Sequence, residues 1–309
     1  MPPARSLSPT GERPLPPARD GWFDLIFAVT IDQDFVRVTA EVDVWANWRE
    51  RRPLVPPETR ARIERFAWAE AAPVETVDFG LEDAFAKVDR LADGRWVLAH
   101  PRCRVGVANA CILDPDGTVA GRMCLGDGIA HLQCDAEGRI WVGYFDEGVY
   151  GNNGWGDQGA PDPIGAGGLI AFTPGGTALW RWFDQPGPSI DDCYALNVGR
   201  DGIWSCFYSA FPLLRVSPGL DSRLWANGVR GASLVAADGD HAILLGGYPP
   251  DRERLALLRL GAEAAEVVAT FAMPGWADSF VAARGGDLHF VAPGSWRRLS
   301  VAEVLAASR

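Results

Sequence analysis

Acidic side chains recur in this chain beside short apolar segments. If the loops that carry them lie at one end of a repeated unit, their carboxylates meet around a common opening. Crowded carboxylates repel one another unless a cation neutralises them, and Ca²⁺ and Mg²⁺ prefer oxygen ligands. Aspartate is also a common turn residue, so the alternative is that these groups bond to local amides. The candidate metal ligands are Glu82, Asp127, Asp146, Glu147, Asp191 and Asp192.

A glycine-rich segment over residues 145–168 is the second feature that could do chemistry. Loops longer than about 12 to 15 residues in a compact domain are usually functional or disordered. This one carries aromatic and amide side chains that suit a lid over the acidic opening, where they could stack on a ligand and hydrogen-bond to it. A flexible linker is the alternative. The candidate ligand contacts are Tyr150, Asn152, Asn153 and Trp155, with Arg102 and Tyr208 in corresponding loops elsewhere.

His131 is the candidate catalytic residue. It alternates with Leu132 in an expected strand, so His131 and Gln133 share one face of that strand. The imidazole could act there as an acid, a base or a metal ligand, or it could be a bonded structural residue. The sequence contains no Ser/His/Asp grouping and no phosphate-binding glycine loop that would favour another chemistry.

A repeated pattern of strands positions these residues. Each copy has a short apolar strand, a turn rich in glycine and aspartate, and a second apolar strand. The second strands begin about 40 to 60 residues apart, which is the spacing of four-stranded β-propeller blades. In such a blade, the loop into the innermost strand and the loop between the second and third strands lie on one face. The copies begin at Ala84, Ala130, Cys193, Ser233 and Ser279.

The clearest copy, Cys134-Asp-Ala-Glu-Gly-Arg-Ile-Trp-Val-Gly143, resembles the blade motif of the two-component regulator propellers. It is also similar to blades of the NHL, virginiamycin B lyase and SMP-30/gluconolactonase families. The resemblance covers roughly residues 84–300 and implies the fold. These families contain sensors, lyases, lactonases and scaffolds, so it implies no single function. Where the lactonase pattern has Glu-Gly-Pro-x-Trp, this chain has Leu81-Glu-Asp-Ala-Phe85.

The expected organisation is an all-β propeller of five or six four-stranded blades. Residues 1–20 contain six prolines and are expected to form a flexible leader. Residues 21–80 are expected to begin with two strands, which form either an added hairpin or half of a sixth blade. A short helix over residues 57–69 and a closing strand over residues 74–79 are expected to follow. The blades then occupy residues 81–309 and form one domain with residues 21–80, with a second short helix over residues 301–307.

The amino-acid composition limits the kinds of partner that the protein is expected to bind and where it is expected to be found. The formal charge of −11 argues against nucleic acid and anionic membranes, which reward clusters of Lys and Arg. No apolar run approaches the roughly 18 residues that would span a bilayer. The six cysteines include no Cys-x-x-Cys pair, and the leader lacks the apolar stretch of a signal peptide. Reduced thiols and a cytoplasmic location are therefore expected.

The function favoured by the sequence is binding of a small ligand or a protein partner at an acidic, aromatic-rimmed face of the central channel. The alternative is a metal-dependent hydrolase, lactonase or lyase that uses the same carboxylates, with His131 as acid or base. A scaffold for protein assembly is a third possibility. No cofactor is specified, and a Ca²⁺ or Mg²⁺ ion is left open.

Overall fold

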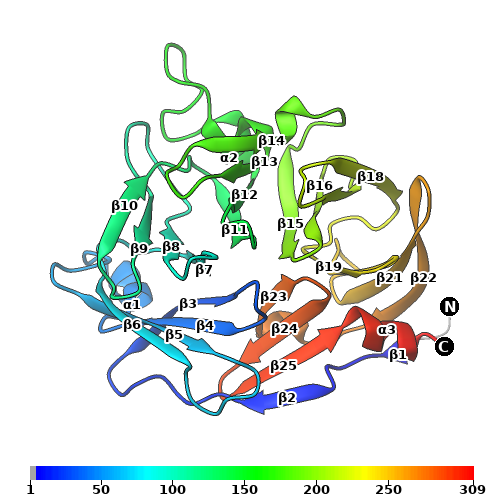
Figure 1. Ribbon diagram of the computed structural model, residues 1–309, viewed down its shortest axis with the longest axis horizontal. Coiled ribbons are helices and arrows are strands. Elements are labelled where there is room, and N and C mark those ends of the chain that lie inside the picture. Colours follow the sequence, from blue (N-terminus) through cyan, green and yellow to red (C-terminus); the bar gives the residue numbers. More distant parts are fainter. Residues whose placement is uncertain (1–4) are drawn as a thin grey trace.

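A computed structural model of the chain describes residues 5–309. Its strands form four-stranded antiparallel meanders arranged around a central channel, which is the architecture of a β-propeller (Figure 1). The first strand of each meander lines the channel and the fourth lies at the rim. The prediction of an all-β propeller is confirmed.

Four blades are separate four-stranded sheets. The first contains β3 (Phe23–Val29), β4 (Phe35–Ala40), β5 (Arg60–Phe66) and β6 (Glu75–Gly80). The second contains β7 (Lys87–Arg90), β8 (Trp96–Ala99), β9 (Ala110–Leu113) and β10 (Val119–Met123). The third contains β11 (Ile129–Cys134), β12 (Ile140–Tyr144), β13 (Leu169–Phe172) and β14 (Ala178–Arg181). The fourth contains β23 (Phe280–Arg284), β24 (Asp287–Ala292), β25 (Ser295–Ser300) and β2 (Gly11–Pro14).

The remaining strands form one nine-stranded sheet. Its first meander contains β15 (Asp192–Gly199), β16 (Gly202–Tyr208), β17 (Leu213–Val216) and β18 (Ser222–Asn227). Its second contains β19 (Leu234–Asp238), β20 (His241–Leu245), β21 (Arg254–Leu260) and β22 (Ala264–Ala272), with β1 (Arg5–Ser6) beside β22. The two meanders fuse because β18 and β22 pair in parallel over two residues each. The expectation of five or six separate blades is therefore not matched: four blades are separate.

The helices are short and lie outside the sheets. They are α1 (Val44–Arg49), α2 (Asp146–Tyr150) and α3 (Val301–Ala307), with the 3₁₀ turns η1 (Ile164–Gly167), η2 (Trp182–Asp184) and η3 (Trp276–Asp278). The expected C-terminal helix is confirmed in α3, where Ser300 and Glu303 form a capping box. Within residues 5–309, no helix has the length and apolar character needed to cross a membrane.

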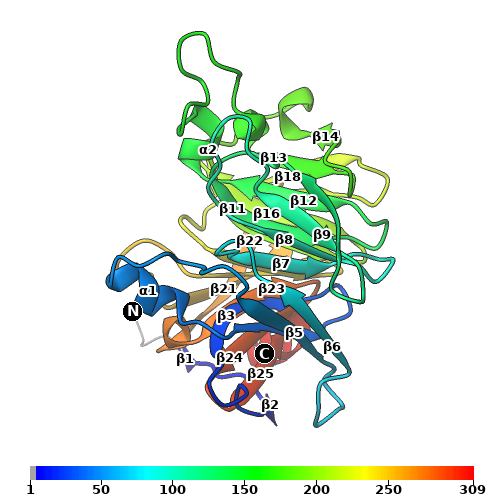
Figure 2. The same ribbon diagram turned by 90° about the vertical axis from the view of Figure 1, so that its left-hand side faces the viewer.

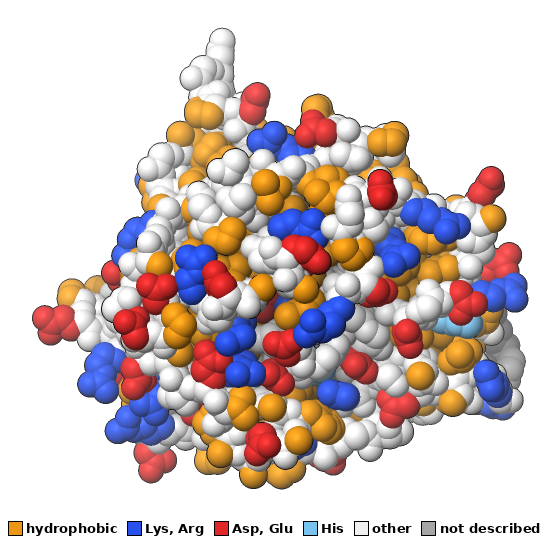
Figure 3. Space-filling model, in the orientation of Figure 1, with side chains coloured by type: hydrophobic (Ala, Val, Ile, Leu, Met, Phe, Trp, Pro, Cys, Tyr) orange, Lys and Arg blue, Asp and Glu red, His pale blue; other side chains and the backbone are white. Residues whose placement is uncertain are grey.

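The two faces of the ring differ. The loop face carries the connections between successive meanders and those from second to third strands. The turn face carries the tight turns between first and second strands. Figure 2 shows the loop face on its left, with α1 and α2, and the turn face on its right. Figure 3 views the turn face, where acidic and basic side chains are interspersed around the centre of the ring.

Hydrogen bonds within the turn explain the repeated strand-turn-strand pattern. The buried Asp135 carboxylate accepts hydrogen bonds from the amides of Glu137 and Arg139, at 3.0 and 2.9 Å. It also accepts one from the indole N–H of Trp141, at 2.7 Å. A single side chain thus closes the β11–β12 turn and holds the aromatic ring of the following strand.

The hydrophobic core lies between neighbouring meanders. Trp141 of β12, for example, packs with Trp180, Cys193 and Phe207 in one cluster. At Gly117, in the β9–β10 turn, a Cβ atom would lie 2.0 Å from the carbonyl oxygen of Asp78 in the preceding blade. Glycine is therefore required there by close packing as well as by its positive φ of 86°.

The N-terminal region departs most from expectation. The helix expected over residues 57–69 is wrong, because β5 occupies Arg60–Phe66 and pairs with both β4 and β6. The strand expected to close the ring is instead β6, the outer strand of the first blade. Closure is provided by β2, whose residues pair with β25. Residues 11–14 of the expected flexible leader are thus part of a blade, and residues 1–4 lie outside the described range.

All six cysteines are free thiols in the structure. Five are buried, and Cys124 is partly exposed with its sulfur 3.5 Å from that of Cys103. The reduced state of the thiols in the cell and the cellular compartment both remain predictions.

Docking of β2 can be tested through Arg13. Its side chain is buried, donates a hydrogen bond to the carbonyl of Ala67 and lies over the Trp296 ring. We expect Arg13→Ala to lower the free energy of unfolding by about 1–3 kcal/mol, because it removes a charge-assisted hydrogen bond and a cation–π contact. Urea denaturation would measure the change. Arg5→Ala, at an exposed arginine in β1, is the matched control, and equal effects of the two substitutions would contradict the docking.

Candidate functional site

The loop face brings together several residues expected there. The guanidinium of Arg102, from the β8–β9 loop, bonds to Asp127 at 3.0 Å and to Glu147 of α2. The hydroxyl of Tyr150 donates to Asp191 at 2.6 Å, across the gap between two blades. The expectation that these loops share one face is therefore confirmed.

The six candidate metal ligands do not converge. Glu82 pairs with Arg122 on the exposed surface. Asp127 and Glu147 both pair with Arg102, whose hydrogen bond holds the pKa of Glu147 below its usual range. Asp146 accepts a hydrogen bond from the amide of the next residue. Within residues 5–309, no three His, Cys, Asp or Glu side chains are grouped closely enough to hold a metal ion.

Asp192 is the one candidate carboxylate with a large pKa shift. It begins β15, and burial together with the nearby Asp146 carboxylate raises its pKa to about 6. A single carboxyl group of this kind can exchange a proton near neutral pH. Within the described chain, Asp192 belongs to no group of three or more His, Cys, Asp or Glu side chains that could hold a metal ion.

The expected lid is anchored to its own side of the ring. Trp155 is buried, and its indole N–H donates to the carbonyl of Cys103 at 2.9 Å. Asn153 bonds to the carboxylate of Asp127 at 3.1 Å, and the side chain of Asn152 accepts the amide of Asn153. Figures 1 and 2 show the segment running outward from the third blade, away from the channel. Trp155 therefore holds the loop in place, and the expected cover over the channel mouth is wrong.

An aromatic cluster does occur at the rim, as expected for Tyr208. Its ring stacks on Tyr194 with centroids 6.2 Å apart. The hydroxyls of Tyr194 and Tyr248 lie 2.7 Å apart, and Phe211 packs against all three rings. With the exposed Tyr150, four of the five tyrosines of the chain lie on this part of the loop face.

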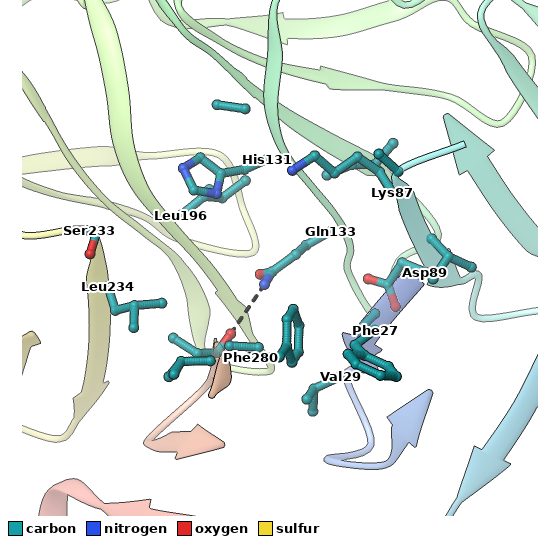
Figure 4. A pocket seen from close by; sticks show the side chains of 18 of the residues that line it. Phe27, Val29, Lys87, Asp89, His131, Gln133, Leu196, Ser233, Leu234 and Phe280 are labelled. Carbon is teal, nitrogen blue, oxygen red and sulfur yellow. Dashed lines mark hydrogen bonds between the residues drawn. The ribbon is translucent and has the colours of Figure 1, made fainter. Parts of the chain in front are cut away.

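The central channel contains a cavity of about 330 Å³. The innermost strands and η3 line it, and Figure 4 shows its side chains. Phe27 and Phe280 meet edge to face in its wall, with centroids 5.6 Å apart. The other apolar lining includes Val29, Leu196, Leu234 and Trp276, and the polar lining includes Lys87, Asp89, His131, Gln133 and Ser233.

A buried polar network separates this cavity from the turn face. The guanidinium of Arg284 in β23 pairs with Asp89 of β7, and both side chains are almost fully buried. Arg284 also donates to the carbonyls of Val29 and Val198, at 2.8 and 3.1 Å, and to the side-chain oxygen of Gln133 at 3.1 Å. Because these partners come from several innermost strands, the network forms the floor of the cavity.

His131 lies in the channel wall with one side open to the cavity. Its Nε2 is 3.0 Å from the carbonyl oxygen of Cys193, which can only accept, so Nε2 carries the proton and Nδ1 has a lone pair. Deep burial and the charge of Lys87 lower its pKa to about 4. The imidazole is therefore neutral at pH 7 and links β11 to β15. Its assignment as a catalytic residue stays a prediction.

Sequence reasoning missed Lys87, Trp276 and the two phenylalanines of the wall. Strand alternation could have located Lys87, since Lys87 and Asp89 must share the channel face of β7 just as His131 and Gln133 share that of β11. Phe27 and Trp276 offered no such signal, because the first belongs to a strand assigned only to an added hairpin or half a blade and the second to a loop.

Comparisons with known proteins identify the fold. A streptogramin B lyase structure matches with a TM-score of 0.50 and 9% identity over 93% of this chain and 96% of that one. The β-propeller domain of Myceliophteria thermophila Cps50 (Swd1) matches with 0.51 and 7% identity over 90% and 83%. Virginiamycin B lyase from Staphylococcus aureus gives 0.49 and 9% over 94% and 98%. No protein-family model and no curated protein matches the chain. The protein is therefore similar to β-propellers in fold alone.

The buried pair of Arg284 and Asp89 in the floor of the cavity leads to a prediction about stability. Arg284→Met leaves the Asp89 carboxylate buried without its partner, so we expect the free energy of unfolding to fall by about 3–5 kcal/mol. Adding Asp89→Leu removes the orphaned charge and should recover part of the loss. Urea denaturation of the single and double variants measures both effects.

Arg181→Met is the control for that experiment. Arg181 is exposed on the rim strand β14, so its substitution should change stability by less than about 0.5 kcal/mol. An Arg284→Met protein that unfolds at the same urea concentration as the control would contradict the structural role of the network.

Proposed function

We propose that the protein binds a small, mainly apolar molecule in the channel cavity, which the molecule reaches from the loop face. The observation that supports this most directly is the composition of the cavity. Aromatic and aliphatic side chains form most of its wall, and a few polar groups converge from different strands. This is the usual make-up of a small-molecule site, in which apolar area supplies affinity and polar groups fix orientation.

The shape of the channel supports the same proposal. The network around Arg284 and Asp89 gives the cavity a floor, so a ligand would be held in a blind pocket. The volume of about 330 Å³ is at the lower end of the range for drug-sized ligands, roughly 300–1,000 Å³. Ser233 and Trp276 also line a second depression beside Tyr248, which would let a longer ligand extend onto the loop face.

A protein partner at the tyrosine cluster is a second candidate. Tyr150, Tyr208 and Tyr248 are each more than 40% exposed, and tyrosine is enriched where protein surfaces associate. The cluster adjoins the carboxylates of Asp146, Asp191 and Asp192, so a basic partner would suit it. The metal-dependent hydrolase is favoured less, because its proposed ligands are dispersed or already paired with arginines.

Filling the cavity tests the proposal. Leu234→Trp places a large ring in the wall near the loop face, whereas Val267→Trp adds the same ring at an exposed position of β22. We use N-phenyl-1-naphthylamine, an uncharged fluorescent aromatic molecule, as the probe. Loss of the cavity should weaken its binding by about tenfold or more, equivalent to about 1.4 kcal/mol.

A fluorescence titration of the natural protein and the two variants gives the result. Weak binding to Leu234→Trp alone supports the channel as the site. Equal binding to all three proteins, or no saturable binding to the natural protein, contradicts it.

A further inference from the structure

Lys87 is the only lysine among the 29 basic residues of the chain. It lies on the innermost strand β7, and its side chain enters the channel cavity. Figure 4 shows the side chain extending across the cavity towards His131. Every other Lys/Arg position holds arginine, so the one side-chain amine of the protein is inside its central pocket.

The amine has no protein partner. Within residues 5–309, no hydrogen bond or ion pair joins the side-chain amine of Lys87 to another side chain or to the backbone, and burial is the one cause of its pKa shift. The titratable residues of the cavity lining are Lys87, Asp89 and His131. Asp89 is committed to Arg284 and to the amide of Cys134, and His131 is bonded to Cys193.

This environment favours the neutral amine. Burial without a compensating carboxylate lowers the pKa of Lys87. A neutral lysine amine in an apolar pocket is a nucleophile, and such amines form Schiff bases with carbonyl compounds.

We propose that Lys87 is a covalent carbonyl-binding residue, whose amine condenses reversibly with an aldehyde or ketone held in the channel cavity. This inference rests on the proposed function, because the carbonyl compound must first occupy that cavity. It deepens that function by naming the reactive class of the ligand: a small aromatic or aliphatic carbonyl compound.

The condensation balances without a co-reactant. The amine nitrogen adds to the carbonyl carbon, and one N–H proton passes to the former carbonyl oxygen to give a carbinolamine. The carbinolamine then loses its hydroxyl group with the second N–H proton as water, which leaves a carbon–nitrogen double bond. Nothing is oxidised or reduced, and hydrolysis reverses the reaction. The lone pair on Nδ1 of His131, which lines the same cavity, is available for proton exchange.

A carbonyl ligand suits the cavity better than a carboxylate ligand. Binding a carboxylate would require Lys87 to become charged and would place two desolvated charges among aromatic side chains, an arrangement that often costs as much as it gains. An imine forms from two neutral groups and keeps the pocket neutral.

Reductive trapping tests the inference. The folded protein is treated at pH 7 with benzaldehyde and sodium cyanoborohydride, and the adduct is located by peptide mass spectrometry. Arg181→Lys supplies an exposed amine for comparison in the same molecule, because Arg181 lies on β14 and has no ion pair within the described residues. Because burial lowers the pKa of Lys87, a larger fraction of its amine is neutral at pH 7 than of an exposed lysine. We therefore expect trapping at Lys87 to be faster than at the introduced amine, and to lose this advantage in urea.

The controls separate this inference from the proposed function. Lys87→Arg should abolish the channel adduct while leaving the one at the α-amino group. If benzaldehyde displaces the fluorescent probe but no faster adduct forms at Lys87, the covalent role is overturned and the cavity proposal stands. If benzoate competes better than benzaldehyde and Lys87→Met removes that preference, Lys87 is an anion-binding residue and the inference is again overturned. If the probe does not bind in the channel at all, the proposed function itself fails.

Discussion

The buried ion pair of Arg284 and Asp89 is the contact on which the ring depends. A guanidinium at the centre of a propeller is expensive to desolvate, so it is tolerated only if its donors are satisfied. Here they reach β3, β7, β11 and β15 from a side chain on β23. Asn197 of β15 connects the remaining innermost strand, β19, because its side chain bonds to Val235 of β19 and to Gly285. The innermost strands are thus fixed relative to one another by polar contacts, while apolar clusters fill the space between the meanders.

The same network borders the cavity in which we propose that a ligand binds. Since the network lies on the turn-face side of that cavity, the proposed ligand would enter from the loops, where Ser233 and Trp276 also line a second depression. The strands of the wall can hold this shape only while the ring is closed, and closure depends on β2 pairing with β25. The short N-terminal strand β2 therefore supports the cavity although it contributes no side chain to the cavity lining.

Much of the fold could be predicted because its signals are local. Asp135, the Glu137–Gly138 turn and Trp141 lie within seven residues and form their contacts with one another. The segment Arg60–Phe66 misled because its Arg, Ala and Glu residues favour helices, although Ala61 and Ile63 alternate as a strand requires. Pairing of β5 with β4 and β6 outweighed that preference for helix. The β2–β25 pairing joins residues almost 290 positions apart, and no local pattern encodes it.

The candidate site shows the same contrast between features set by local sequence and features set by distant partners. Blade geometry correctly placed the acidic loops on one face, yet it could not reveal that Arg102 pairs with Asp127 and Glu147 and that Arg122 pairs with Glu82. Which way a loop side chain turns depends on partners from other blades, whereas a strand side chain must alternate. The channel residues were therefore the more predictable ones: His131 and Gln133 were placed correctly, and the same rule applied to β7 gives Lys87 and Asp89. Of these four, Asp89 and Gln133 belong to the floor and His131 to a strand contact, so the amine of Lys87 is the one that has no protein partner within residues 5–309.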